Sequence, residues 1–333
     1  MMKKRAILFI IIAGIMWGTS GLFSYVFGLY GYTALQKTAV RGTVAFLCML
    51  VFVAIRHREA FRIKLADIWL YAGIGVTLFG AAAAYYAAMV MTSEATAVVL
   101  MYTSPIYVLV FSVLFFDERL TPLKLIGVGG MLLGCCFVSG IFEGFTGNAM
   151  GILMGLLAGV SYGAYNIFAK IAMRRRCAPL STTLYGFAGM AIIAICTCQP
   201  AGILPNMMKN PALLIPLSVG LGVVTYVVPY FLYTLALRDL PAGTASALGI
   251  VEPMAATMFA FLLLDAKASV LSVIGIVLIL GCVLLLSRPE PEKAKKEQDE
   301  PTQETPTQDG EASAENLEKE LQDAMEGSVP SKH

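Results

Sequence analysis

The sequence has little charge for its length. Only 14% of its 333 residues are charged and 58% are hydrophobic, whereas an ordinary soluble domain is about a quarter charged and less than half apolar. Such a chain cannot be solvated as a water-soluble globule, so lipid is the expected solvent for most of it. Its bases form scattered short clusters and no continuous basic face, which argues against a nucleic-acid partner.

The sequence also lacks the patterns of an enzyme or a metal site. Two histidines and seven cysteines without clustered spacing disfavour a zinc module or a disulfide scaffold, and no cofactor is expected. Residues 159–163 match G-x-S-x-G, but that motif needs a strand-to-helix turn and a histidine base. Here it lies inside a hydrophobic run whose glycines recur every fourth residue from Gly151 to Gly163, a spacing typical of close helix packing. No G-x-x-x-x-G-K-[ST] phosphate loop is present, so energy must come from a gradient or from the substrate.

Long hydrophobic runs fill the chain up to residue 288. A membrane-spanning helix needs about 20 mostly apolar residues, and ten runs meet that requirement with short loops between them. The sequence therefore predicts an all-α integral membrane protein with ten transmembrane helices, at residues 6–28, 33–55, 67–89, 93–116, 122–141, 148–172, 180–199, 212–235, 242–264 and 268–287.

The loop charges predict the topology of these spans. If the N-terminus is cytoplasmic, the loops on that side contain 14 lysines and arginines, and the opposite loops contain only Lys37, Lys209 and Lys267. Cytoplasmic loops are enriched in lysine and arginine. Both termini are therefore predicted to be cytoplasmic in a multi-pass protein of the plasma membrane, which agrees with an even number of spans.

The last 45 residues have a different composition. Residues 289–333 contain 13 acids and 5 bases in a Glu/Gln/Thr/Pro-rich stretch, which cannot bury enough apolar surface to offset the entropy of the chain. This segment is predicted to be a disordered, acidic cytoplasmic tail.

The hydrophobic body contains an internal repeat. Residues 85–139 align with residues 233–287 at an offset of 148, with shared Tyr85/Tyr233, Pro105/Pro253 and Asp117/Asp265. An offset of 145 pairs Gly14 and Gly18 with Gly159 and Gly163, and Trp17 with Tyr162. Two repeats, 6–141 and 148–288, then hold five spans each. Because five is odd, the second repeat enters the membrane from the opposite side, and such inverted repeats are typical of secondary transporters with alternating access.

Several motifs resemble those of the EamA-type branch of the drug/metabolite transporter superfamily. They are Trp17-Gly18, Arg41, Pro105 followed by residues 117–121 (Asp-Glu-Arg-Leu-Thr), and Val251-Glu252-Pro253. The resemblance covers residues 6–288 and implies two five-helix units and secondary transport, often export, of small metabolites. One position departs from the family pattern, because Ala266 stands where an acidic residue equivalent to Glu118 is usual.

Two ionisable residues lie deep in predicted spans. Burying a charge in a bilayer costs about 2.5–3.5 kcal/mol on insertion scales, so each such residue is a functional hypothesis. Glu252 lies near the middle of the ninth span, and Arg41 lies in the second span at a slightly shallower depth. The carboxylate could bind an amino group or a coupling proton, and the guanidinium could bind a substrate carboxylate. Alternatively, the two residues form a structural ion pair, which we expect to be the more common arrangement.

Aromatic and polar residues at related positions are candidates to line a substrate cavity. Aromatic walls with a few polar groups suit small amphipathic substrates, although most such side chains in helices serve packing. Pro105 and Pro253 are candidate helix breaks, since proline removes a backbone donor. The candidate binding residues besides Glu252 and Arg41 are Trp17, Tyr85, Tyr102, Ser104, Tyr162, Asn166 and Tyr233.

The function that fits these features is a secondary transporter, with an exporter implied by the resemblance. Its expected partners are a small-molecule substrate, the lipid bilayer and a coupling proton if transport is proton-driven. Amino acids, nucleosides, sugar derivatives and amphipathic drugs all fit, and proton antiport, exchange and uniport stay open, as does the oligomeric state. The alternative is a membrane sensor or adaptor that signals through its acidic tail. An intramembrane enzyme is disfavoured by the scarcity of histidine.

Overall fold

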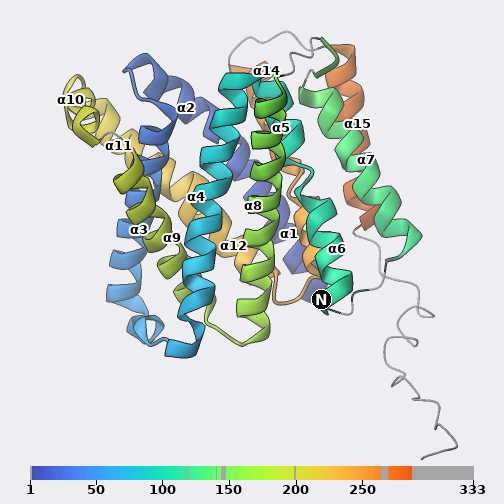
Figure 1. Ribbon diagram of the computed structural model, residues 1–333, viewed down its shortest axis with the longest axis horizontal. Helices are drawn as coiled ribbons and strands as arrows, with labels where there is room; N and C mark the ends of the chain where they lie inside the picture. Colours follow the sequence, from blue (N-terminus) through green and yellow to red (C-terminus); the bar gives the residue numbers. More distant parts are fainter. Residues whose placement is uncertain are drawn as a thin grey trace, which may run out of the picture. The chain divides into compact units, whose positions relative to one another are not determined.

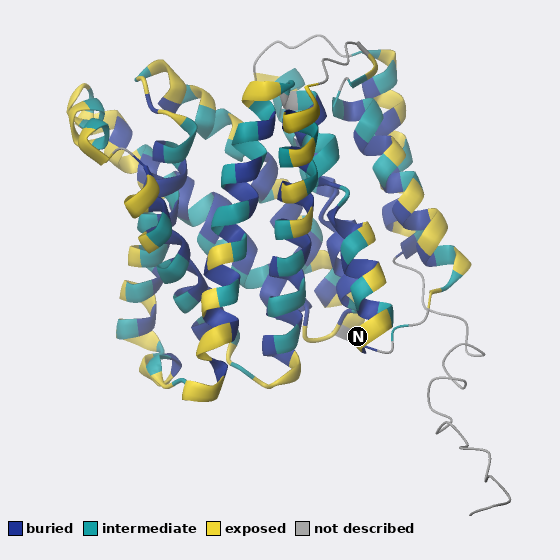
Figure 2. Cartoon of the chain, in the orientation of Figure 1, coloured by how far each residue is buried: buried dark blue, intermediate teal, exposed yellow. Residues whose placement is uncertain are grey.

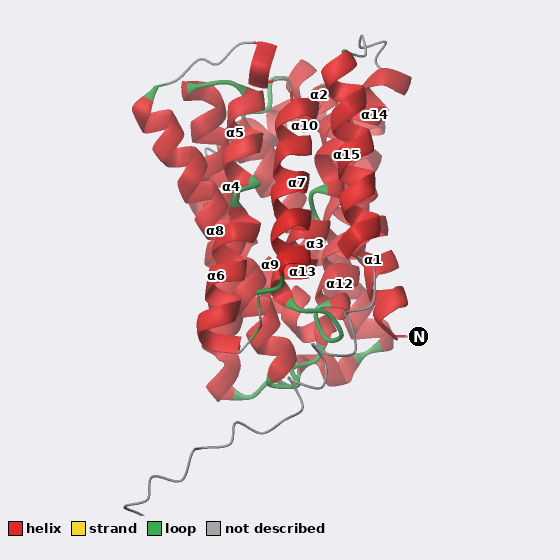
Figure 3. Ribbon diagram, turned by 90° about the vertical axis from the view of Figure 1, so that its right-hand side faces the viewer, coloured by secondary structure: helices red, strands yellow, loops and turns green. Residues whose placement is uncertain are grey.

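The described part of the chain is a bundle of helices (Figures 1 and 3). This computed structural model describes residues 2–116, 118, 120–139, 141–143, 148–198, 200–263 and 269–286. No strand occurs among these residues. The predicted acidic tail, residues 289–333, lies outside them.

The first half of the bundle has helices of very different lengths. A capping box at Thr33 and Gln36 begins α3, and Ser93 caps α5 through the backbone N–H of Thr96. Two short 3₁₀ turns, Arg58–Phe61 and Leu65–Asp67, connect α3 to α4. The helices are α1 (Met2–Gly18), α2 (Ser20–Leu29), α3 (Ala34–Arg56), α4 (Ile68–Met91), α5 (Glu94–Met101), α6 (Ser104–Phe116) and α7 (Pro122–Ser139).

The second half follows after residues 144–147. Asn148 caps α8, and proline occupies the first turn of both α9 and α11, where its missing N–H costs nothing. The helices are α8 (Ala149–Arg174), α9 (Pro179–Thr197), α10 (Ile203–Met208), α11 (Pro211–Gly222), the π-helical segment Val223–Val227, α12 (Val228–Ala236), α13 (Ala242–Leu248), α14 (Val251–Leu263) and α15 (Val270–Leu286).

These helices confirm an all-α membrane protein. Among the described residues, nine helices or consecutive helix pairs are long and apolar enough to cross a bilayer. The tenth predicted span coincides with α15, an apolar helix of 17 residues. The count of ten spans therefore stays a prediction.

Four predicted spans are not continuous α-helices, which corrects the expectation for 6–28, 93–116, 212–235 and 242–264. The first span breaks at Thr19, whose hydroxyl donates to the Met16 carbonyl over 2.7 Å, and the fourth breaks at Thr103, whose hydroxyl donates to the Leu100 carbonyl over 2.6 Å. Such bonds offer the backbone an alternative to the helix. The eighth span widens into a π-helix just before Pro229, which cannot donate to a carbonyl of the preceding turn.

The outer surface of the bundle is apolar. Figure 2 shows buried residues gathered between the helices and exposed residues on their outward faces. Val90, Leu262 and Leu284 are 80%, 72% and 70% exposed. In water such a surface would aggregate, but against lipid tails it carries no cost. The outward faces therefore fit a multi-pass membrane protein.

Small residues set the closest contacts between helices. A Cβ on Gly75 of α4 would lie 2.8 Å from the Cα atom of Gly189 in α9, and a Cβ on Gly275 of α15 would lie 2.7 Å from the carbonyl oxygen of Gly134 in α7. The glycine row of α8 packs as expected, with Gly151 against Met91 and Gly155 against Leu100. The G-x-S-x-G match lies inside this continuous helix.

One end of the bundle is rich in lysine and arginine. There α1 begins, while α3, α6, α8 and α12 end, as the lower part of Figure 1 shows. Arg175 forms an ion pair with Asp67 at 2.9 Å, which joins the turn after α8 to the turn before α4. We call this the basic end and the other the opposite end.

Candidate functional site

Two helix breaks place the candidate site inside the bundle. The chain leaves α5 at Met101 and begins α6 at Ser104, and it leaves α13 at Leu248 and begins α14 at Val251. Pro105 and Pro253 stand in the first turns of the new helices. Both breaks adjoin the predicted prolines, and at the offset of 148 they lie within one residue of equivalent positions of the two halves.

A glycine-bearing helix packs against each break. Gly159 of α8 approaches Thr103, with 2.7 Å between a Cβ at this glycine and the threonine Oγ1 atom. Gly14 of α1 approaches Val251, with 3.1 Å between a Cβ at this glycine and the valine Cβ atom. These pairs are equivalent under the two sequence offsets. At the next position of each break, one half has Ser104 and the other has Glu252.

Glu252 lies in the first turn of α14. Its side chain is partly buried. Tyr102 and Tyr162 lie within electrostatic range of its carboxylate. The Tyr102 hydroxyl is buried and lies toward the Glu252 carboxylate, without a hydrogen bond of standard geometry to a described residue.

Arg41 of α3 does not form the expected ion pair. Its guanidinium carbon lies 4.9 Å from the ring centre of Tyr226, and its Nε atom is buried without a hydrogen-bond partner in the described part of the chain. The ion pairs within 4.0 Å among the described residues are His57–Glu59 and Arg175–Asp67. Arg41 and Glu252 thus lie within electrostatic range of each other without a direct ion pair in this conformation. The arginine takes the face of an aromatic ring, which attracts a cation through its quadrupole.

An aromatic cluster brings three of the predicted residues together. Trp17 meets Tyr230 at 5.0 Å and Tyr233 at 5.6 Å between ring centres. Tyr162 stacks on Tyr165 at 6.0 Å, and Tyr165 lies 5.4 Å from Tyr230. The tryptophan Nε1 atom and the Tyr165 hydroxyl are buried without hydrogen-bond partners among the described residues.

Asn166 and Tyr233 are engaged with each other. The Tyr233 hydroxyl donates to Asn166 Oδ1, and Asn166 Nδ2 donates to the Tyr162 carbonyl over 2.7 Å. Asn166 is fully buried and Tyr233 is 1% exposed. This network joins α8 to α12, so both residues serve packing in this conformation.

Tyr85 and Ser104 occupy different surroundings. Tyr85 is half-buried on α4 and lies 5.5 Å from Tyr86, which is within electrostatic range of Arg41. Ser104 is fully buried at the break before α6, and its hydroxyl has no hydrogen-bond partner among the described residues. Ser104 is thus enclosed within the bundle, and Tyr85 lies beside Tyr86.

The sequence reasoning missed two tyrosines that dominate the cluster. The guanidinium of Arg41 lies over the ring of Tyr226. The ring of Tyr230 contacts those of Trp17, Tyr165 and Tyr226. Their signal was available, because tyrosines at 226, 230 and 233 recur at the i, i+4, i+7 spacing of one helix face.

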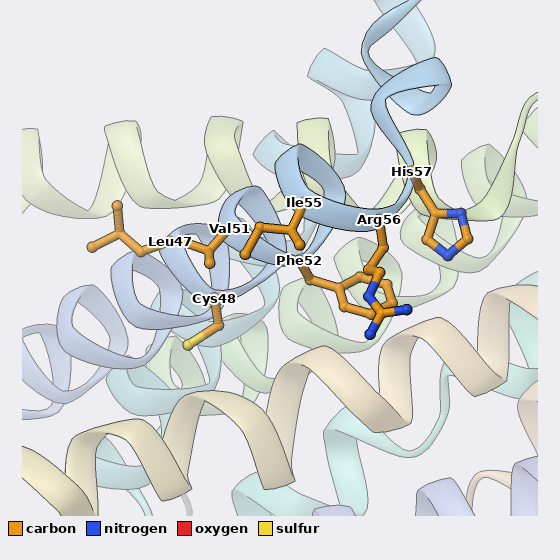
Figure 4. A pocket seen from close by; sticks show the side chains of 7 residues that line it. All are labelled: Leu47, Cys48, Val51, Phe52, Ile55, Arg56 and His57. Atoms are coloured by element: carbon orange, nitrogen blue, oxygen red, sulfur yellow. The ribbon is translucent and has the colours of Figure 1, made fainter.

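Two cavities of this conformation differ in size and place. A cavity of about 10 Å³ beside the cluster is lined by Tyr165, Phe187 and Tyr230 among others, enough for about one water molecule. A groove of about 870 Å³ runs along the outer face of α3 from Leu47 to His57, with all seven lining side chains on one stretch of chain (Figure 4). That groove lies on the surface that fits lipid, away from the aromatic cluster.

The comparison with known proteins decides the family. The EamA-like transporter family matches residues 4–140 and again residues 149–288. The chain belongs to this family. The earlier resemblance is thereby confirmed, and the protein is a transporter with a multi-pass membrane domain.

Relatives of this EamA-like transporter have the same general description. An uncharacterized transporter of Archaeoglobus fulgidus is 28% identical over 217 residues, which cover 65% of this chain and 75% of that protein. The uncharacterized transporter YdfC of Bacillus subtilis is 26% identical over 299 residues, which cover 85% of this chain and 92% of the relative. A solved structure described as "Crystal structure of protein" is similar with a TM-score of 0.69 at 20% identity, over 85% of this chain and 96% of that one. This last likeness concerns the fold alone.

Proposed function

We propose that this EamA-like transporter is a secondary transporter that exports small metabolites, such as amino acids or amphipathic drugs, across the plasma membrane by alternating access. One observation carries the proposal. Glu252 and Arg41 lie inside the bundle without an ion-pair partner among the described residues, beside buried polar atoms that have no hydrogen-bond partner there.

The unpartnered groups suit a substrate with charged and aromatic parts. A buried donor or acceptor without a partner costs about 1–3 kcal/mol, and more if it is charged. A bound molecule would remove this cost if its amino group met Glu252, its carboxylate met Arg41 and its apolar part lay on Trp17 or Tyr230. An amino acid or another small amphipathic zwitterion has these three parts. Glu252 also offers a site for a coupling proton.

Two inverted repeats, 6–141 and 148–288, would supply the two access states. Several features support this arrangement: the double family match, the equivalent helix breaks, and the packing of helices. In particular, α8 packs on α4 and on the α5–α6 break, while α1 packs on α12 and on α14. When the halves are exchanged, the α8–α4 contact corresponds to the α1–α12 contact, and the contact of α8 with the α5–α6 break corresponds to the contact of α1 with α14.

The basic end is proposed to face the cytoplasm, together with both termini. The loops at this end contain most of the lysines and arginines outside the tail, and such loops stay on the cytoplasmic side. Export then means passage from the basic end to the opposite end, the direction that the family resemblance implies.

Reconstitution into liposomes tests the proposal. Uptake of a panel of amino acids, nucleosides, sugar derivatives and amphipathic cations is measured with and without a pH gradient. We expect at least one substrate to be transported, and Glu252→Gln and Arg41→Lys to lower its flux about tenfold or more, the effect of losing a hydrogen bond to a charged group.

Matched substitutions at the surface serve as controls. Glu59→Gln and Arg62→Lys make the same chemical changes at exposed positions and should leave the flux unchanged. Full transport by both site variants, or equal losses in the site and control variants, would contradict the assignment of the site.

A further inference from the structure

Lys170 makes a buried contact at the basic end that the proposed site does not use. It lies near the end of α8, and its Nζ atom donates to the carbonyls of Leu237 and Leu240 over 2.7 and 2.6 Å. These carbonyls follow the end of α12, where the last turn of a helix leaves acceptors unsatisfied. The lysine thus ties α8 to the connection between α12 and α13.

Arg174, one helical turn further along, makes a similar contact with a different element. Its Nη2 atom donates to the Phe116 carbonyl over 2.9 Å, and its guanidinium carbon lies 4.4 Å from the centre of the Phe116 ring. Phe116 is the last residue of α6. The arginine therefore joins α8 to the end of α6, the segment that follows the break at Tyr102 and Thr103.

Glu118 completes a triangle of contacts. Its Oε1 atom accepts a hydrogen bond from the backbone N–H of Ala242, the first residue of α13, over 3.1 Å. It also lies within electrostatic range of Lys170, as does Asp239. Through Glu118 the end of α6 is joined to the start of α13, and these two helices also contact each other directly.

In the sequence, the opposite end lacks matching side chains at the three equivalent positions. The offset of 148 places Ala266 at the position of Glu118, and the offset of 145 places Tyr25 and Leu29 at the positions of Lys170 and Arg174. The lysine contacts of the opposite end join other elements, because Lys37 donates to the Ser24 carbonyl over 2.7 Å and the exposed Lys209 donates to the Tyr30 carbonyl over 3.1 Å. Among the described residues, these charged contacts therefore belong to the basic end.

We propose that Glu118, Lys170 and Arg174 form a latch that holds the basic end closed and that opens once in each transport cycle. The proposal rests on the proposed function, since a latch matters only if the site alternates between the two ends. One break lies between α5 and α6 beside Tyr102, and the other lies between α13 and α14 beside Glu252. The latch joins α6 to α13, the two segments that reach the basic end. Substrate can enter from the basic end only if these segments separate.

Accessibility of the site from each end tests the latch. Ser104→Cys, in a chain without its seven native cysteines, serves as a reporter in sealed vesicles, and a membrane-impermeant maleimide is added from either side. With an intact latch we expect slow labelling from the basic end. Lys170→Met should speed that labelling about tenfold, because it removes hydrogen bonds made by a charged group, whereas Lys170→Arg should keep it slow.

A second variant and a matched control make the result decisive. Glu118→Gln should also speed labelling from the basic end, and it tests the latch if Lys170→Met fails to fold. Lys209→Met removes a lysine–carbonyl contact at the opposite end and should leave labelling from the basic end unchanged. Unchanged labelling in folded Lys170→Met and Glu118→Gln, or an equal increase in Lys209→Met, would overturn the latch.

The labelling assay needs no substrate, so the two proposals can fail separately. Flux in liposomes with unchanged labelling would reject the latch and keep the transporter. Faster labelling in the latch variants without flux of any substrate would keep the closed basic end and reject the proposed transport.

Discussion

Glu252 illustrates how one residue can be placed from sequence while its partner cannot. Its position in the middle of a hydrophobic run and before Pro253 was enough to single it out. The identity of the Arg41 partner depends on the rotation of α3 about its axis, which places the guanidinium over Tyr226. That rotation is set by packing between helices distant in the chain, and no local pattern records it.

The ring of Tyr226 is therefore expected to hold the Arg41 guanidinium in position for substrate binding. Tyr226→Phe keeps the aromatic face under the guanidinium and should preserve flux, whereas Tyr226→Leu removes the cation–π contact, worth about 0.5–2 kcal/mol, and should lower the affinity for substrate. The measurement is the substrate concentration at half-maximal flux. Equal losses of affinity in Tyr226→Phe and Tyr226→Leu would show that the hydroxyl matters and the ring face does not.

Asn166 is expected to act on stability. Asn166→Leu leaves the buried Tyr233 hydroxyl without its acceptor and should reduce the free energy of unfolding by about 1–3 kcal/mol, measured as a lower melting temperature in detergent. Asn206→Leu removes an exposed hydrogen bond to the Gly31 carbonyl and should cost less. Equal melting temperatures for the two variants would place Asn166 outside the structural core.

At the scale of elements, the helical runs were predictable and only some of their interruptions were. Hydrophobic length located every described helix longer than 17 residues, because burying a backbone in lipid demands a helix. The break at Thr19 was missed, because the apolar pattern continues through it. Pro105 and Pro253 pointed to two other breaks, and hydroxyl groups that compete for helix carbonyls complete the explanation.

Close packing of α4 and α9 gives a prediction for a single methyl group. Gly75→Ala would place a Cβ 2.8 Å from the backbone of Gly189, so the helices must separate, at a cost of about 1–3 kcal/mol. Gly129→Ala adds the same methyl group where no atom lies within 4 Å and should be neutral or slightly stabilising. Melting temperatures compare the two, and equal values would contradict the tight crossing.

The turn between α8 and α9 has a natural chemical reporter. Burial raises the pKa of the Cys177 thiol, so a smaller fraction is the reactive thiolate at neutral pH. We expect maleimide to label Cys177 more slowly than the exposed Cys196, and the rate at Cys177 to increase as the pH is raised toward 9. A labelling rate at Cys177 that does not change with pH would contradict a raised pKa of this thiol.

At the scale of the whole molecule, the transporter and the tail-based signaller make opposite predictions. If the helical body transports substrate, deletion of residues 289–333 should leave flux in liposomes unchanged, because the candidate site lies within residues 17–252. If neither the full chain nor the shortened chain transports any substrate, and the deletion abolishes a cellular response, the sensor or adaptor is favoured.

The inverted arrangement of the two halves underlies the whole account, and sidedness of labelling tests it most directly. Single cysteines are placed at Lys4, before the first repeat, and at Asn148, before the second, in a cysteine-free chain, and an impermeant maleimide is added to intact or inverted vesicles. The account predicts that Lys4→Cys and Asn148→Cys react from opposite sides. Reaction of both from the same side would mean parallel halves and would contradict alternating access between inverted repeats.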